Sequence, residues 1–239
     1  MTTWQQRYVR RFYDPASGWR NGTEEFHASC RAAIVAGPIL EIGAGPTNAT
    51  SDYLATIGEL HGLDLDADVR GNRALKRAMV FDGDRFPVEN ETYSACVSNY
   101  VLEHVGDPHG HLGEVFRVLK PGGAYIFRTP NRYHYVSLIS LLTPDWFHQA
   151  AVNRLRNLGP EAHDPYPTRY LLNTRADVVK QAHLAGFTVE SLQLVEKEPS
   201  YGMSSRLLFM AFMAYERLVN ASERLSDLRA NLFVVLRKP

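Results

Sequence analysis

The sequence predicts an α/β fold in which helices flank a parallel sheet, and three observations support this class. Strand-like and helix-like patterns alternate from about residue 38 to residue 130, as they do in successive β-α-β units. The apolar run Ile39–Ile42 leads into a glycine-containing turn, which is typical of a buried strand. Asp107 is a favourable N-cap and Pro108 suits the first position of a helix, so a helix is expected to start there.

The other elements have signals of their own. Apolar runs bounded by turn residues predict the strands Ile39–Ile42, Glu59–Leu65, Ala78–Phe81, Ser94–Ser98, Ala124–Thr129, Phe187–Leu194 and Leu232–Leu236. Helices are expected near residues 48–57, from Pro108 to a turn at residues 121–123, and from the N-cap Thr174 to Gly186. A further helical stripe, expected to belong to the core or to a dimer surface, consists of Leu207, Ala211, Ala214, Leu218 and Leu225.

Composition excludes several classes of function. The 239 residues carry a formal net charge of +0, which gives no global attraction to nucleic acid or anionic lipid, although Arg7, Arg10 and Arg11 form a local basic group. The two cysteines, Cys30 and Cys96, lack the number for a disulfide framework and the spacing of zinc ligands. No signal peptide or membrane-spanning stretch is recognised. We expect a cytoplasmic monomer or homodimer that takes a small-molecule substrate and has no metal, nucleic-acid or membrane partner.

The most informative segment follows the first strand. Glycines at positions 43 and 45 allow a sharp turn and a close approach of the backbone to a ligand. Asp64 lies 21 positions after Gly43, where a carboxylate suits a ribose diol. Asn48 occupies the place of the third glycine of a dinucleotide site, and Glu41 would repel a pyrophosphate but attract an ammonium group. The residues therefore predict a nucleoside with a cationic tail, and S-adenosylmethionine (SAM) has that character.

Several motifs in this order make the chain similar to the class I SAM-dependent methyltransferases of the small-molecule type. The matching segments are Leu40-Glu41-Ile42-Gly43-Ala44-Gly45, Gly62-Leu63-Asp64-Leu65, Asp82-Gly83-Asp84-Arg85-Phe86-Pro87, Ser98-Asn99-Tyr100-Val101-Leu102-Glu103-His104-Val105 and Val118-Leu119-Lys120-Pro121-Gly122-Gly123. The resemblance covers about residues 30–130 most closely. It implies a doubly wound, Rossmann-like sheet of seven strands, mostly parallel, with the last strand antiparallel. The chain departs from the family pattern at residues 46–48, where the family often has Gly-Thr-Gly.

The resemblance also implies how the methionine and ribose parts of SAM are held. The backbone at Gly43 and Gly45 would pass beside the methionine part, and Glu41 would lie near its ammonium group. The carboxylate of Asp64 would accept hydrogen bonds from both ribose hydroxyls. These four residues are therefore expected to bind the cofactor.

The adenine ring and the sulfonium are assigned to four further positions by the same resemblance. Leu65 would pack on the face of the adenine. Asp82 would accept a hydrogen bond from the adenine amino group, and the Gly83 N–H would donate to a ring nitrogen. Asn99, at the end of the fourth strand, would lie near the sulfonium.

Residues 1–239 are predicted to form a single SAM-binding domain, with an N-terminal helical segment at 1–35 and a cap insertion at 131–173. The cap is expected because this segment is rich in aromatic and histidine side chains and directly follows the fifth strand, where ligands of open α/β sheets bind. Asn131, His134 and Tyr170 are the predicted catalytic residues. His134 is the candidate general base, since an unperturbed imidazole titrates near neutral pH.

Three functions remain open from the sequence. The first is methyl transfer from SAM to a small-molecule acceptor, for which alignment of an already activated donor supplies much of the rate. The second is an intramolecular cyclisation of SAM that releases methylthioadenosine, as in azetidine-2-carboxylate synthases. In that case Asn131 and Tyr170 would hold the amino and carboxylate ends of the SAM side chain. The third is a SAM-binding subunit without activity.

Overall fold

The computed structural model describes residues 3–142 and 166–239. The chain divides into two compact units. One unit comprises Met1–Glu25, Asn131–Pro167 and Leu194–Asn231, and the other comprises Phe26–Pro130, Thr168–Gln193 and Leu232–Pro239. Residues 143–165, which make up much of the predicted 131–173 cap, lie outside the described residues. The cap and the single-domain organisation therefore stay predictions.

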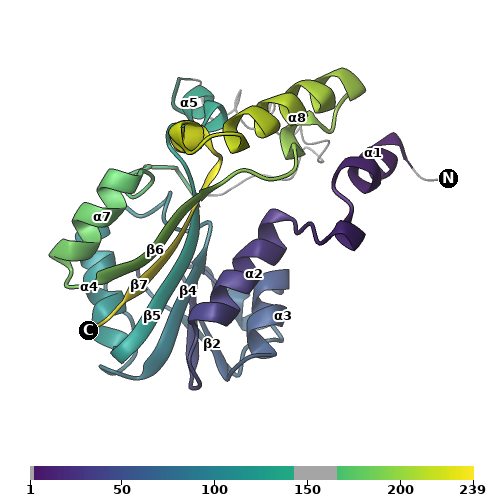
Figure 1. Ribbon diagram of the computed structural model, residues 1–239. Coiled ribbons are helices and arrows are strands. Elements are labelled where there is room, and N and C mark those ends of the chain that lie inside the picture. The colour runs from purple at the N-terminus through teal and green to yellow at the C-terminus, as the bar shows by residue number, and fades with distance from the viewer. Residues whose placement is uncertain (1–2, 143–165) are drawn as a thin grey trace. The chain divides into compact units, whose positions relative to one another are not determined.

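A seven-stranded sheet forms the centre of the second unit (Figure 1). Its strands are β1 (Ile39–Ile42), β2 (Leu60–Asp64), β3 (Arg77–Val80), β4 (Tyr93–Asn99), β5 (Leu119–Pro130), β6 (Thr188–Val195) and β7 (Asn231–Arg237). The strand order is β3-β2-β1-β4-β5-β7-β6. The pairs β1–β2, β1–β4, β2–β3 and β4–β5 are all parallel.

The last strand is antiparallel to its neighbour β5. Near the start of β5, the Gly122 N–H donates to the carbonyl of Lys238 at 2.9 Å, just beyond the end of β7. Just beyond the other end of β5, the Asn131 N–H donates at 2.7 Å to the carbonyl of Ala230, which directly precedes β7. The predicted doubly wound sheet with an antiparallel last strand is therefore confirmed.

Helices cover both faces of this sheet, α2 and α3 on one and α4 and α7 on the other (Figure 1). The bounds of these helices are α2 (Gly22–Ala33), α3 (Ala49–Ala55), α4 (Pro108–Val118) and α7 (Arg175–Leu184). The predicted caps are confirmed, because Asp107 accepts from the Gly110 N–H and Thr174 accepts from the Asp177 N–H. The predicted turn at residues 121–123 belongs to β5 instead, where these residues follow a register shift in the β4–β5 pairing.

The first unit is built from helices packed around aromatic side chains. Its helices are α1 (Trp4–Phe12), α5 (Tyr135–Leu142) and α8 (Arg206–Asn220), with the short 3₁₀ helices η1 (Pro15–Ser17), η3 (Ser200–Gly202) and η4 (Glu223–Leu228), whereas η2 (Ala67–Gly71) belongs to the second unit. Phe209 of α8 is fully buried and meets the rings of Trp4 and Tyr8 edge to face. The buried Tyr13 hydroxyl donates to Glu216 Oε2 at 3.1 Å. These contacts fasten α1 to α8.

The predicted stripe on α8 lies on the outer face of this helix. Leu207 is 81% exposed and Leu218 is 61% exposed, while the buried positions of α8 are Phe209, Glu216 and Val219. Helical periodicity was therefore correct, but the stripe is not core among the described residues. Leu225 lies beyond the end of α8, in η4.

None of the helices within residues 3–142 and 166–239 combines the length and the apolar character that crossing a bilayer requires.

The turn after β1 depends on two glycines with positive φ, +71° at Gly43 and +53° at Gly45. A Cβ atom at Gly43 would collide with the side chain of Val101, whereas a Cβ at Gly45 would meet no atom within 4 Å. The two positions therefore share a backbone constraint, and only Gly43 adds a steric one.

We expect Gly43→Ala to lower the free energy of unfolding by about 2–4 kcal/mol, because left-handed strain and overpacking add. Gly45→Ala, the matched control, should lose only about 1–2 kcal/mol from left-handed strain. Urea unfolding of both variants measures the difference. Equal losses would contradict the steric role of Gly43.

Candidate functional site

The carboxylate of Asp64 is tied directly to the glycine turn. Its Oδ2 accepts the Gly45 N–H at 2.7 Å, and its Oδ1 accepts the Asp66 N–H at 2.9 Å. These bonds join the carboxyl ends of β1 and β2, which are neighbouring parallel strands. A carboxylate offers about four lone-pair positions, so two remain for further donors such as the hydroxyls of a ribose.

Glu41 lies beside this turn as a buried carboxyl group. It is 2% exposed, and its Oε2 accepts the Ser51 hydroxyl at 2.6 Å. Burial raises the pKa of Glu41 to about 7, the hydrogen bond from Ser51 opposes this shift, and the charges of Asp64 and Asp52 add to it. A cation beside Glu41 would relieve this electrostatic penalty. The site is therefore suited to an ammonium group.

Three polar residues that the sequence analysis did not assign hold the turn together. Asn48 caps α3 by accepting the N–H groups of Thr50 and Ser51, and its Nδ2 donates to the Ala44 carbonyl at 2.7 Å. Asn72 is buried and donates to Ser51 Oγ at 2.9 Å. The departure from a third glycine thus has a structural explanation, since Asn48 replaces backbone freedom with side-chain hydrogen bonds.

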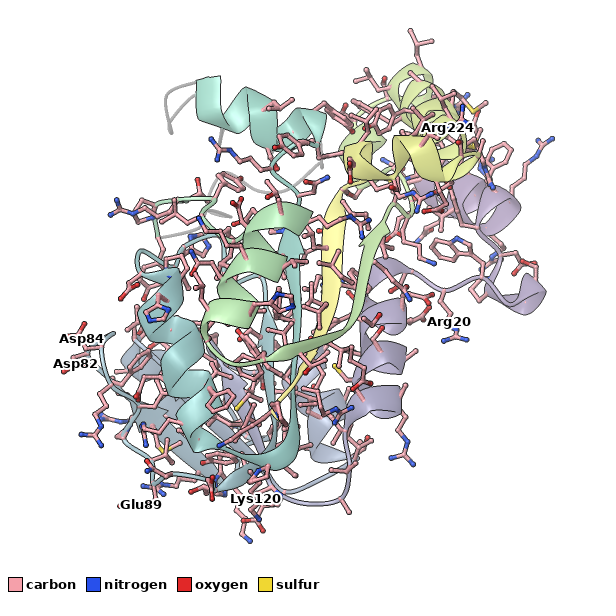
Figure 2. All side chains as sticks on the ribbon, turned by 60° about the vertical axis from the view of Figure 1, so that its left-hand side comes forward. Arg20, Asp82, Asp84, Glu89, Lys120 and Arg224 are labelled. Atoms are coloured by element: carbon pink, nitrogen blue, oxygen red, sulfur yellow. The ribbon has the colours of Figure 1, made fainter. Side chains whose placement is uncertain are left out.

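The residues predicted to bind adenine adjoin one another at the next two strand ends. Leu65 is 46% exposed, and a Cβ built on Gly83 would lie 3.6 Å from its Cδ2. Gly83 has a φ of +103°, and the neighbouring Asp82 accepts the Asp84 N–H at 3.2 Å. Both aspartates are exposed and project outward from the ribbon in Figure 2. An exposed leucine beside this acidic turn offers an apolar face with a polar edge.

Asn99 is held by side chains from both neighbouring segments. Its Oδ1 accepts Arg128 Nε at 2.8 Å, and its Nδ2 donates to Thr50 Oγ1 at 3.0 Å. The buried Arg128 guanidinium lies over the ring of Tyr100, 4.5 Å from its centroid, and 5.1 Å from that of Phe26. These contacts orient the amide of Asn99 at the carboxyl end of β4, and Arg128 is a further residue that sequence reasoning missed.

Two of the three predicted catalytic residues, Asn131 and His134, belong to the first unit. Asn131 is buried, and its Nδ2 donates to the carbonyls of Asp227 and Arg229 at 2.7 and 2.8 Å. His134 is also buried, and its Nε2 lies 3.5 Å from Glu196 Oε2. Burial lowers the pKa of His134 to about 4 and raises that of Glu196 to about 8, so both groups are neutral near pH 7.

The third predicted catalytic residue, Tyr170, belongs to the second unit. It is buried in a left-handed conformation with φ of +53°, and its N–H donates to the Glu103 carbonyl at 3.1 Å. The buried Glu103 side chain accepts the Thr129 hydroxyl at 3.0 Å, and Thr129 in turn accepts from Asn173 Nδ2 at 2.7 Å. Glu103 of the predicted Glu-His pair thus belongs to a buried hydrogen-bond network.

We expect ionisation of Glu41 to destabilise the ligand-free protein. A carboxyl group whose pKa is higher in the folded than in the unfolded state stabilises at low pH, and this contribution is lost as pH rises from about 4.5 to 7. The shift corresponds to roughly 3 kcal/mol. The stability of Glu41→Gln relative to the native chain should therefore increase by about that amount between pH 5 and pH 8 in urea unfolding. A difference that does not change with pH would show that Glu41 keeps an ordinary pKa.

The geometry fits SAM. The open space at Gly45 leaves room for close approach of a ligand, the buried Glu41 suits an ammonium group, and Asp64 keeps acceptor capacity for a ribose. When bound, SAM supplies a methyl group activated by a sulfonium. The chain supplies the acidic groups and the shape around them.

Comparisons with known proteins agree with this arrangement. Residues 40–127 match a family model described as a methyltransferase domain. The chain is 24% identical over 148 residues to an uncharacterized methyltransferase of Anoxybacillus flavithermus, which covers 57% of this chain and 70% of that protein. It is 23% identical over 192 residues to a ubiquinone biosynthesis O-methyltransferase of Hydrogenovibrio crunogenus, which covers 79% of this chain and 73% of that protein.

A solved structure shows the same fold. The putative methyltransferase of Bacillus halodurans superposes with a TM-score of 0.55 at 15% sequence identity, covering 90% of this chain and 99% of that chain. The matched family model spans β1 to β5, which carry the glycine turn and the strand-end acids. The chain therefore belongs to the class I SAM-dependent methyltransferases and uses S-adenosylmethionine as its cofactor.

Proposed function

We propose that this methyltransferase transfers the methyl group of SAM to a small-molecule acceptor. The observation that carries the proposal is the clasp formed by Gly45 and Asp64 beside the buried Glu41, which suits a zwitterionic nucleoside. The small-molecule class is supported by the relative from Hydrogenovibrio crunogenus, whose name assigns it to ubiquinone biosynthesis. Its alignment covers most of both chains and extends beyond the cofactor-binding segment.

In this proposal each acidic residue recognises one part of the cofactor. Glu41 faces the ammonium group, Asp64 accepts from the ribose hydroxyls, and Asp82 accepts from the adenine amino group. Leu65 packs on the adenine face, while the backbone at Gly43, Gly45 and Gly83 allows close approach. Asn99 acts as a positioning residue near the sulfonium, because its amide is already bonded to Arg128 and Thr50.

The chain accelerates the reaction chiefly through alignment. Holding donor and acceptor in line contributes on the order of 7–11 kcal/mol in favourable cases, so a strong base is not required. The acceptor must still lose a proton when its new bond to carbon forms. His134 remains the proposed proton acceptor, with Asn131 and Tyr170 as proposed acceptor-side residues. The low pKa of His134 keeps its imidazole neutral and able to accept a proton.

Product analysis tests the proposed reaction. The purified protein is incubated with SAM alone and with SAM plus a cell extract separated by size into small-molecule and macromolecular fractions. We expect S-adenosylhomocysteine to appear only with the small-molecule fraction. Methylthioadenosine formed without any acceptor would replace methyl transfer by cyclisation of SAM. Activity only with the macromolecular fraction would overturn the acceptor class, and SAM binding without turnover in any mixture would indicate a binding subunit.

We expect Asp64→Ala to weaken SAM binding by about 1.5–3 kcal/mol, the scale of hydrogen bonds to a charged group, or roughly 10- to 100-fold in Kd. Asp68→Ala is the matched control, since it removes an exposed carboxylate from the same segment. Isothermal titration calorimetry with SAM gives both constants. Equal affinity of the Asp64→Ala variant and the native chain would remove Asp64 from the site.

A further inference from the structure

The outer face of α8 carries an apolar stripe that the helical bundle of the first unit does not cover. Leu207, Met210, Ala211, Ala214 and Leu218 lie at helical spacing, and all five are exposed. Leu207 is more exposed than any other large apolar side chain among the described residues. Three large apolar side chains aligned on one helix face form a continuous patch, and such patches mark interaction surfaces.

Positive charge borders this stripe on one side. Arg206 and Arg217 directly precede Leu207 and Leu218, and because 11 residues make almost three turns, both arginines lie on the same flank of α8. Arg217 Nη2 donates to the Phe12 carbonyl at 3.3 Å. The flank that carries the two arginines is therefore the one against which α1 packs.

Helix α1 adds three more arginines to this part of the unit. Its ring side chains, Trp4 and Tyr8, pack on Phe209, whereas Arg7, Arg10 and Arg11 are exposed. In a helical projection these arginines occupy the side opposite the ring face. The helix is thus amphipathic, with a basic polar face.

Acidic side chains do not offset these arginines on either helix, both of which the structure describes in full. Helix α1 has no acidic residue, and the one acid of α8, Glu216, is buried and bonded to Tyr13 and Asn220. In the adjoining η4 segment, Glu223 is paired with Arg229 at 2.8 Å. The exposed charges of α1 and α8 are therefore all positive, although the whole chain is neutral.

We propose that α1 and α8 form a docking surface for an anionic lipid bilayer. An apolar helix face flanked by arginines suits the membrane interface, where leucine and methionine side chains enter the acyl boundary and the cations meet acidic headgroups. Arginine side chains can keep their charge at the headgroups while their stems cover apolar surface. The charge complementarity selects acidic lipid over a second copy of this chain, because two copies of the surface would bring arginines together. The surface requires no spanning helix, only in-plane contact.

Vesicle flotation of the full chain tests this proposal. Phosphatidylcholine vesicles with and without phosphatidylglycerol are the probes, in low and in high salt. We expect the protein to float with the anionic vesicles in low salt, less in high salt, and not with pure phosphatidylcholine. Failure to float with anionic vesicles, or equal binding to both vesicle types, would overturn the proposal.

Paired variants assign the binding to this surface. Leu207→Ser with Leu218→Ser should weaken vesicle binding at least ~10-fold, because each leucine loses several buried CH₂ groups. Leu184→Ser, which alters a leucine of α7 with 61% exposure, is the matched control and should bind like the native chain. Unchanged binding of the double variant would move the contact elsewhere and overturn the proposal.

A second set of variants tests the arginines. Replacing Arg7, Arg10 and Arg11 by glutamine should weaken binding to anionic vesicles roughly 100-fold. The equal charge change made at Arg31, Arg70 and Arg77 is the control and should leave most of the binding. Equal losses in the two triple variants would reduce the effect to net charge and overturn the assigned surface.

Two further measurements close the alternatives. Thermal melting and calorimetry with SAM show whether each variant is folded and whether its cofactor site is intact. Light scattering reports the oligomeric state. A dimer that the two leucine substitutions convert to a monomer, in a protein that does not float with anionic vesicles, would show that a second copy covers the stripe.

Discussion

The hydrogen bond from the Gly45 N–H to Asp64 Oδ2 is the constraint on which the cofactor site depends. It joins the turn after β1 to the end of β2, and the two parallel strands bring its partners together although they are 19 positions apart in the chain. The positive φ of both Gly43 and Gly45 is what directs the N–H toward the carboxylate. The same contact therefore shapes the loop and orients the group proposed to bind the ribose.

Buried polar groups around this clasp are satisfied mostly by the protein itself. Ser51 bonds Glu41, Asn72 bonds Ser51, and Asn48 bonds the backbone of the turn. Such a network keeps the loop in one arrangement before a ligand arrives, which lowers the entropy that binding would otherwise lose. Glu41 is different, because burial leaves its charged form unfavourable until a cation compensates it. Cofactor binding and the ionisation of Glu41 are therefore expected to be coupled.

The two compact units differ in what they leave at the surface. In the second unit, the exposed Leu65 lies at a strand end beside the acidic turn, as expected for a residue that a nucleoside covers. In the first unit, the exposed apolar residues are aligned along one helix and accompanied by arginines. Exposed apolar surface thus has two separate explanations in one chain, and each is tied to a different neighbouring charge.

Local and periodic features were predictable from the sequence alone. These include the alternation of strands and helices, the caps Asp107 and Thr174, and the pairing of the glycine turn with Asp64, because each depends on neighbouring residues or on the regular geometry of β-α-β units. Contacts between distant residues were not predictable. The capping role of Asn48, the Arg128–Asn99 bond, the burial of Asn131 and His134, and the exposure of the α8 stripe were decided by tertiary structure. A periodic pattern shows that a helix has an apolar face, but only packing shows whether that face meets the core or is left to solvent.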